Sequence, residues 1–239
     1  MATNSAPGGD PVVDLAALRG GLVVSCQAEE GDPLHGPVFM AAFARAAEQA
    51  GAVGIRANGP EDIAAVRAAC KLPLIGLYKL RRPGQDVYIT PGVEEVRAVI
   101  AAGADIVAMD GTARPRPDGS RLAALFQLAH GLGVRALADV STLEEGLAAE
   151  AAGADLLSTT LSGYTPYSPP GPEPDLDLVA ALARHAHVPV LAEGRITRPE
   201  QARQALDAGA WAVVVGGAIT RTGWIARQFV LALKEGELH

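Results

Sequence analysis

The chain has 239 residues, of which 49% are hydrophobic, 20% are charged and 4% are aromatic, and its formal net charge is −7. This much apolar material can form a large core and excludes a mostly disordered chain, and Ala, Val and Leu must fill that core. The acidic balance argues against nucleic acid and anionic membranes as partners, because both require a basic surface. An anionic ligand would therefore have to be held by a local site.

Cysteine usage and hydropathy indicate where the protein works. Cys26 and Cys70 form neither a disulfide framework nor a zinc-ligand pattern, which is typical of reduced cytoplasmic thiols. Residues 1–10 lack the basic and apolar regions of a signal peptide. No uninterrupted apolar stretch approaches the roughly 18 residues of a membrane span. We therefore expect a cytoplasmic protein with no membrane partner.

The tripeptide Ala-Gly-Ala occurs four times, about 50 residues apart, and an apolar run follows each copy. A glycine that ends a helix directly before a buried strand is a common helix-to-strand connection. Four further β-rich runs lie between these copies. The eight predicted strands are therefore 21–25, 53–55, 73–77, 105–109, 134–138, 155–157, 188–192 and 211–215.

Helical segments separate these runs, and several helix starts are marked by capping residues. Thr90 before Pro91 and the segment 197–200 each offer an N-cap with proline in the first turn, and 141–144 offers a cap followed by a carboxylate. Alternating helices and apolar strands indicate a parallel sheet buried on both faces. The even repeat predicts one α/β domain over residues 11–239, a (β/α)₈ TIM barrel, with residues 1–10 as a flexible tail. A doubly wound open sheet is the alternative.

Ionisable residues stand at the predicted strand ends, where the active sites of such barrels lie. Lys79 directly follows the apolar run 74–78, and a desolvated lysine there can act as a base or as a Schiff-base nucleophile. We favour such a role over the alternative, a surface loop lysine. Asp139 and Glu193 follow the fifth and seventh strands and fit proton transfer, or an ion pair with Lys79 or Arg56. Asp110 is placed similarly, or it braces arginines of its own loop.

The last two strand ends carry glycine-rich turns with arginines nearby. Glycines let backbone N–H groups approach an anion, and the loops after strands seven and eight are the usual phosphate position in these barrels. Gly194, Arg195, Gly216 and Gly217 are thus the predicted phosphate-binding residues, unless the glycines only form tight turns.

Two long loops, 80–90 and 161–176, are candidate lids, and hydroxyls beside the second, including Thr160, can contact a sugar. The five histidines show no metal-ligand spacing, so we predict no metal.

Taken together, these segments resemble the bacterial N-acetylmannosamine-6-phosphate 2-epimerase family from about residue 18 to residue 234. The resemblance rests on Ser25-Cys26-Gln27-Ala28, Gly54-Ile55-Arg56-Ala57-Asn58, Gly76-Leu77-Tyr78-Lys79 with Tyr88-Ile89-Thr90-Pro91, Asp110-Gly111-Thr112 with Arg114 and Arg116, Ala138-Asp139-Val140-Ser141, 159–165, Ala192-Glu193-Gly194-Arg195-Ile196 and 215–221.

The resemblance implies an isomerase of amino-sugar and sialic acid catabolism that interconverts N-acetylmannosamine 6-phosphate and N-acetylglucosamine 6-phosphate without a metal or organic cofactor. It implies that Lys79 moves the C2 proton, that Glu193 assists at the C1 oxygen and that Asp139 orients the lysine or the substrate. The residues implied to bind substrate are Gln27, Arg56, Thr160 and Arg221.

Two other functions remain open from the residues alone. One is a Schiff-base aldolase that uses Lys79, and the other is a non-catalytic binder of a phosphorylated sugar. Four inward ionisable groups argue against the second, because a binding module does not need such a costly set. A homodimer is one candidate assembly, which the sequence leaves open.

Overall fold

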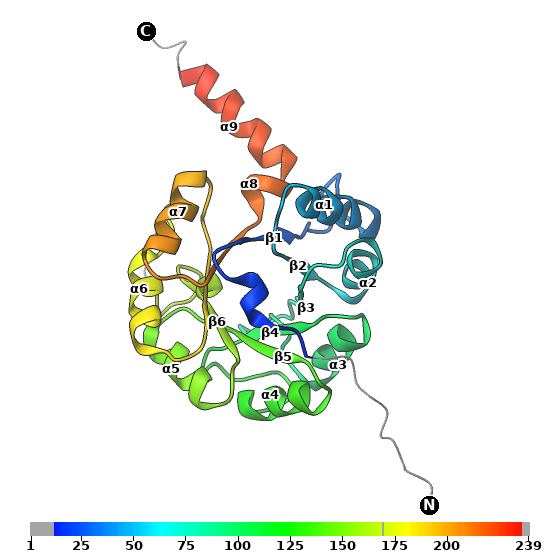
Figure 1. Ribbon diagram of the computed structural model, residues 1–239, viewed down its shortest axis with the longest axis vertical. Helices are drawn as coiled ribbons and strands as arrows, with labels where there is room; N and C mark the ends of the chain where they lie inside the picture. The colour runs from blue at the N-terminus through cyan, green and yellow to red at the C-terminus, as the bar shows by residue number, and fades with distance from the viewer. Residues whose placement is uncertain (1–11, 169, 236–239) are drawn as a thin grey trace, which may run out of the picture.

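The computed structural model describes residues 12–168 and 170–235, and it shows eight parallel strands closed into a barrel and surrounded by helices (Figure 1). The strands pair in chain order, and β1 pairs with β8 to close the ring. They are β1 (Leu22–Cys26), β2 (Gly54–Asn58), β3 (Leu74–Leu77), β4 (Ile106–Asp110), β5 (Arg135–Asp139), β6 (Leu156–Ser158), β7 (Val190–Glu193) and β8 (Ala212–Val215). The predicted (β/α)₈ barrel is thus confirmed, and the predicted tail at residues 1–10 lies outside the described residues.

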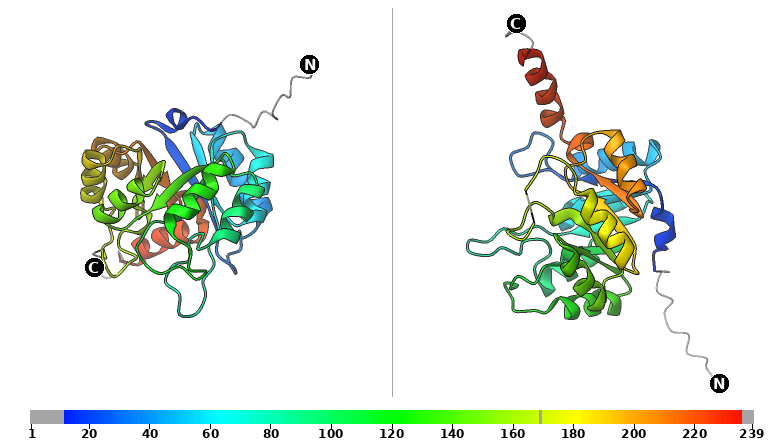
Figure 2. Two further views of the ribbon diagram at one scale, coloured as in Figure 1. Left: turned by 90° about the horizontal axis from the view of Figure 1, so that it is seen from below. Right: turned by 90° about the vertical axis from the view of Figure 1, so that its left-hand side faces the viewer.

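Most of the helices lie around the outside of the barrel, whereas the C-terminal helix extends away from it, as two further views show (Figure 2). They are α1 (Pro37–Gln49), α2 (Pro60–Ala69), α3 (Val93–Ala101), α4 (Leu122–Gly131), α5 (Leu143–Ala151), α6 (Leu176–His185), α7 (Pro199–Asp207), α8 (Gly217–Thr220) and α9 (Thr222–Glu235), with short 3-10 helices η1 (Leu15–Leu18) and η2 (Thr159–Leu161). Over the described ranges, no helix has both the length and the apolar character needed to cross a membrane.

Two of the predicted helix starts lie within one residue of those in the structure, and one is wrong. Pro199 begins α7, and Thr142 caps α5 in a capping box with Glu145, one residue later than predicted. Thr90 does not cap α3, which begins at Val93. Its hydroxyl instead donates to the carbonyl of Ala108 at 2.6 Å, because the chain before α3 packs against β4.

Several strands extend one residue further than the apolar runs predicted, and this extension brings polar side chains into the sheet. Asp110 pairs in register with Asp139, and both carboxylates are fully buried. Successive residues of a strand face opposite sides of the sheet, so a residue two positions after an inward apolar residue also points inward. Leu137 and Leu191 belong to the cluster that fills the barrel. The same alternation directs Asp139 and Glu193 into the barrel mouth above them.

The eighth βα unit differs from the other seven. Its first helix, α8, has four residues, and α9 then leaves the barrel instead of returning along it (Figure 1). Large apolar side chains on α9 are therefore exposed, notably Phe229 at 69% and Leu233 at 75%. The outer ring of helices is consequently left incomplete between α7 and α1.

Candidate active site

A cavity of about 920 Å³ opens at the carboxyl ends of the strands, mainly between β1, β2, β3, β7 and β8. Polar side chains and glycines form much of its wall. Eight of the eleven predicted site residues line it: Gln27, Lys79, Glu193, Gly194, Arg195, Gly216, Gly217 and Arg221. The other three, Arg56, Asp139 and Thr160, do not line the cavity but contact Glu193 or one another directly.

Arg56 is the centre of this inner group. It projects from β2 with only 1% of its surface exposed, and its Nη2 lies 2.7 Å from Oδ2 of Asp139 while its Nη1 lies 3.3 Å from Oε2 of Glu193. Burial alone would lower the pKa of Arg56, but the two carboxylates outweigh it and raise that pKa overall. The guanidinium therefore remains charged and holds two otherwise repelling carboxyl groups together.

Glu193 lies between the buried group and the cavity. Burial raises the pKa of its carboxyl group, and the nearby charge of Asp139 raises it further. The charges of Arg56 and Lys79 act in the opposite direction, as would a hydrogen bond donated to it by the hydroxyl of Thr160. A carboxyl group with a raised pKa can hold a proton near neutral pH and donate it to an oxygen atom.

Lys79 follows β3 at the rim of the cavity. Its backbone N–H donates to Oδ1 of Asn58 at 2.8 Å, and a β-bridge to Ile89 fixes the chain on its other side. The surrounding protein lowers the pKa of its amine, first by desolvation and then through the positive charge of Arg56, while Glu193 and Asp139 oppose this shift. The side chain takes part in none of the ion pairs formed by residues 12–168 and 170–235. The side chain of Lys79 is exposed at the rim of the cavity, and its lowered pKa makes its amine a better base near neutral pH than an ordinary lysine.

The predicted phosphate residues form the opposite wall. Gly194 has φ +114°, which favours glycine, and Gly216 comes so near β1 that a Cβ there would lie 3.2 Å from Cβ of Ser25. Gly217 begins α8, and the first N–H groups of a helix have no partner within the helix. This wall therefore offers backbone donors to an anion.

Arg195 lines the cavity, but its side chain binds the loop 161–176. Its Nε donates to the carbonyl of Glu173 at 2.7 Å, its Nη1 donates to the carbonyl of Ser162, and its guanidinium lies 5.6 Å from the ring centre of Tyr164. A Cβ at Gly163 would meet this guanidinium, so glycine is needed there. The side chain of Arg195 thus fastens the long loop beside the cavity.

Asp110 braces its own loop, as one of the two interpretations anticipated. Its carboxylate accepts from Arg114 at 2.7 Å and from the hydroxyl of Thr112 at 2.6 Å, and it does not line the cavity. Within the described ranges, no three His, Cys, Asp or Glu side chains are grouped so that they could hold a metal ion.

Sequence reasoning missed two residues of the site. Ser158 ends β6, fully buried, with its Oγ 2.8 Å from Oγ1 of Thr160 and 3.4 Å from Oε2 of Glu193. Asn58 ends β2 and holds the backbone of Lys79. Strand alternation could have identified Ser158, because it lies two residues after the inward-facing Leu156. The contact of Asn58 depends on the neighbouring strand and had no local signal.

The profile of the family described as "Putative N-acetylmannosamine-6-phosphate epimerase" matches residues 40–235. Two relatives named "Putative N-acetylmannosamine-6-phosphate 2-epimerase" come from Caldanaerobacter subterraneus and Cutibacterium acnes. The first is 53% identical over 92% of this chain and 94% of the relative, and the second is 48% identical over 88% and 94%.

A solved structure of N-acetylmannosamine-6-phosphate 2-epimerase from Clostridium perfringens superposes with a TM-score of 0.90 at 42% identity, over 95% of this chain and 99% of that one. Thiamine phosphate pyrophosphorylase from Pyrococcus furiosus superposes with a TM-score of 0.56 at 19% identity, over 86% of this chain and 89% of that one. The second likeness shows the barrel fold alone.

The lowered pKa of Lys79 predicts that its amine loses its proton at a lower pH than the other two lysines of the chain, Lys71 and Lys234. Reductive ¹³C-methylation keeps the amines basic, so an NMR titration can follow all three signals, with Lys79→Ala assigning the resonance of Lys79. We expect its midpoint to lie below those of Lys71 and Lys234, which lie outside the cavity and serve as internal controls. Three coincident midpoints would show that the amine is not perturbed.

Proposed function

The chain belongs to the N-acetylmannosamine-6-phosphate epimerase family, and we propose that it interconverts N-acetylmannosamine 6-phosphate and N-acetylglucosamine 6-phosphate in amino-sugar catabolism. One observation carries this proposal. Lys79, with a lowered pKa, and Glu193, with a raised pKa, line the same cavity. Such a pair supplies both a base for a carbon-bound proton and an acid for an oxygen atom.

The reaction moves one proton at C2 of the ring-opened sugar. Neutral Lys79 takes the C2 proton, the electron pair of the broken C–H bond forms the enolate, and Glu193 donates its proton to O1. The planar intermediate turns so that its other face meets Lys79, and a proton returns from Lys79 to that face of C2. O1 gives its proton back to Glu193, and the configuration at C2 is inverted. Two matched groups with shifted pKa values are what this chemistry requires near neutral pH. Neither group is consumed in the cycle.

The cavity also offers groups that suit the rest of the substrate. The backbone at Gly194, Gly216 and Gly217 would bind the phosphate, with Arg221 beside it. Gln27 donates from Nε2 to Ser25 at 2.8 Å, and its buried Oε1 has no partner among the described residues. That oxygen would accept the N–H of the acetamido group. We propose that the protein acts in the cytoplasm, which is consistent with its two free cysteines, Cys26 and Cys70.

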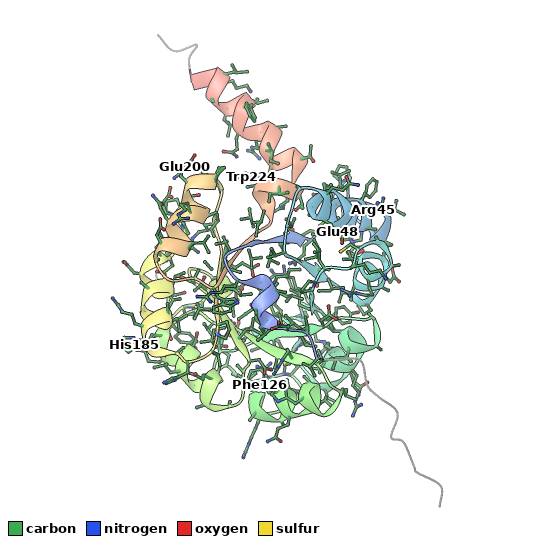
Figure 3. All side chains as sticks on the ribbon, viewed as in Figure 1. Arg45, Glu48, Phe126, His185, Glu200 and Trp224 are labelled. Atoms are coloured by element: carbon green, nitrogen blue, oxygen red, sulfur yellow. The ribbon has the colours of Figure 1, made fainter. Side chains whose placement is uncertain are left out.

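The exposed helix α9 supports a homodimer as the working assembly. Its apolar residues include Trp224 at its base (Figure 3) and Phe229 and Leu233 further along. Val38 and Phe39 of α1 are also exposed, at 77% and 40%, beside the incomplete part of the helix ring. At 14 residues, α9 is as long as α1, which has 13, so it is long enough to fill that place. Two copies would exchange α9 reciprocally, each completing the ring of the other in one two-fold interface.

The proposed reaction predicts deuterium at C2 when N-acetylmannosamine 6-phosphate is converted in D₂O, followed by ¹H NMR. Lys79→Ala should lower kcat by about 10²-fold or more, because it removes the base. Lys71→Ala, at an exposed lysine outside the cavity, is the matched control and should retain activity. Absence of turnover would reject the function, and borohydride trapping of a substrate adduct would favour the aldolase instead.

If the phosphate binds this wall, unphosphorylated N-acetylmannosamine should have a kcat/KM about 10²-fold or more below that of the phosphorylated sugar. A loss of this size corresponds to the free energy of one or two charge-assisted hydrogen bonds. Inorganic phosphate should compete with the phosphorylated substrate and leave turnover of the free sugar almost unchanged. Equal kcat/KM values for the two sugars would contradict the assignment of Gly194, Gly216 and Gly217.

The α9 exchange predicts twice the chain mass in size-exclusion chromatography with light scattering. The double variant Phe229→Asp/Leu233→Asp places two charges on the apolar side chains of α9 and should yield monomers. Gln228→Asp adds one charge at an exposed polar position of the same helix and should remain dimeric. A monomeric wild type, or a dimeric double variant, would refute the exchange.

A further inference from the structure

Two hydroxyl groups lie between the two carboxyl groups of the site. Thr160, in η2 directly after β6, has its Oγ1 2.6 Å from Oδ1 of Asp139 and 3.0 Å from Oε2 of Glu193. Ser158 lies 2.8 Å from the same Thr160 oxygen. With Arg56 bound to both carboxyl groups on the other side, the four residues Arg56, Asp139, Thr160 and Glu193 form a closed ring of polar contacts.

The protons in this ring can be counted. A threonine hydroxyl has one proton to donate and two lone pairs that accept. Thr160 therefore cannot donate to both carboxyl groups, and the shorter contact, to Asp139, is the stronger candidate for its proton. If Glu193 were ionised, two acceptor oxygens would then face each other at 3.0 Å. The contact becomes a hydrogen bond when Glu193 itself is protonated and donates to Thr160.

The charges around the ring favour the same arrangement. Arg56 is nearer to Asp139, at 2.7 Å, than to Glu193, at 3.3 Å. Asp139 is fully buried, whereas 13% of the side chain of Glu193 is exposed and Glu193 lines the cavity. Asp139 thus has both the nearer cation and the hydrogen bond donated by Thr160, and these favour its ionised form. Glu193, which is nearer the cavity, keeps the proton.

We propose that Thr160 is a positioning residue that divides the roles of the two carboxyl groups: its hydroxyl donates to Asp139 and accepts from Glu193, so that Asp139 stays the anionic partner of Arg56 and Glu193 holds the exchangeable proton. The use of that proton on a substrate rests on the proposed function, whereas its place on Glu193 does not. The proton passes from Glu193 to the substrate oxygen and back, and Thr160 and Asp139 keep their own protonation states. Ser158 donates to the remaining lone pair of Thr160 or to Glu193.

The direct test is a ¹³C NMR titration of protein labelled in its glutamate carboxyl groups, with Glu193→Gln assigning the signal of Glu193. Thr160→Val keeps the size of the side chain but removes the hydroxyl, and Thr160→Ser keeps the hydroxyl as the matched control. Loss of the acceptor destabilises protonated Glu193, so its pKa should fall by about half to one unit in Thr160→Val. Thr160→Ser should titrate like the wild type.

Kinetics give a second test. In Thr160→Val the limb of the kcat profile on which Glu193 loses its proton should move to lower pH, with kcat about threefold to tenfold lower and KM within about twofold. A residue with only a structural role would lower the amount of folded protein without moving this limb, and a ligand of the substrate would change KM instead. A Glu193 pKa that does not change in folded Thr160→Val overturns the proposal, even if the wild type is an active epimerase. A Glu193 pKa that rises also overturns it, because it would show that Thr160 donates to Glu193 instead of accepting from it. If the wild type does not epimerise, the NMR titration still decides where the proton lies.

Discussion

The guanidinium of Arg56 is the interaction on which the site depends. It lies almost fully buried in the barrel mouth and binds Asp139 and Glu193, which come from strands far from it in sequence. Without this cation, nothing would offset the repulsion between two ionised carboxyl groups that lie close together in a region of low dielectric. Removing one member of such a buried group typically costs about 3–5 kcal/mol, because the charge left behind has no partner. Truncation of Arg56 is therefore expected to destabilise the barrel mouth.

The same cation influences both groups proposed to move protons. Its charge lowers the pKa of Lys79, adding to the larger effect of burial, and it limits the rise in the pKa of Glu193. The pKa of Lys79 is therefore lowered with the help of Arg56, whereas the pKa of Glu193 is raised in spite of it. Mutations of Arg56 would change the protonation of both groups together, so their kinetic effects could not be assigned to one of them.

The parts of the site differ in what holds them. Arg56, Asp139, Ser158 and Glu193 belong to strands, whose ladders fix the backbone, and Lys79 follows β3 directly. The phosphate wall and the loop 161–176 depend on turns, on Gly194, and on the guanidinium of Arg195. The acid–base groups are thus carried by the rigid barrel, whereas the groups that would hold and cover the substrate are carried by loops. This division is common in barrels of this type.

The sequence by itself determined the eight strands, the barrel and the types of residue at the strand ends, because these follow from local periodicity and from the Ala-Gly-Ala repeat. It also predicted that Lys79 and Glu193 line one cavity, since all parallel strands end on the same side. It left open whether the carboxylates pair with Lys79 or with Arg56. It also did not predict three contacts or placements: the side chain of Arg195 binds a loop, Thr90 donates to β4, and α9 leaves the barrel. Only the tertiary structure decided these points. Arg56 and Asp139 are separated by 83 positions in the chain, and closure of the barrel alone brings their side chains within 2.7 Å.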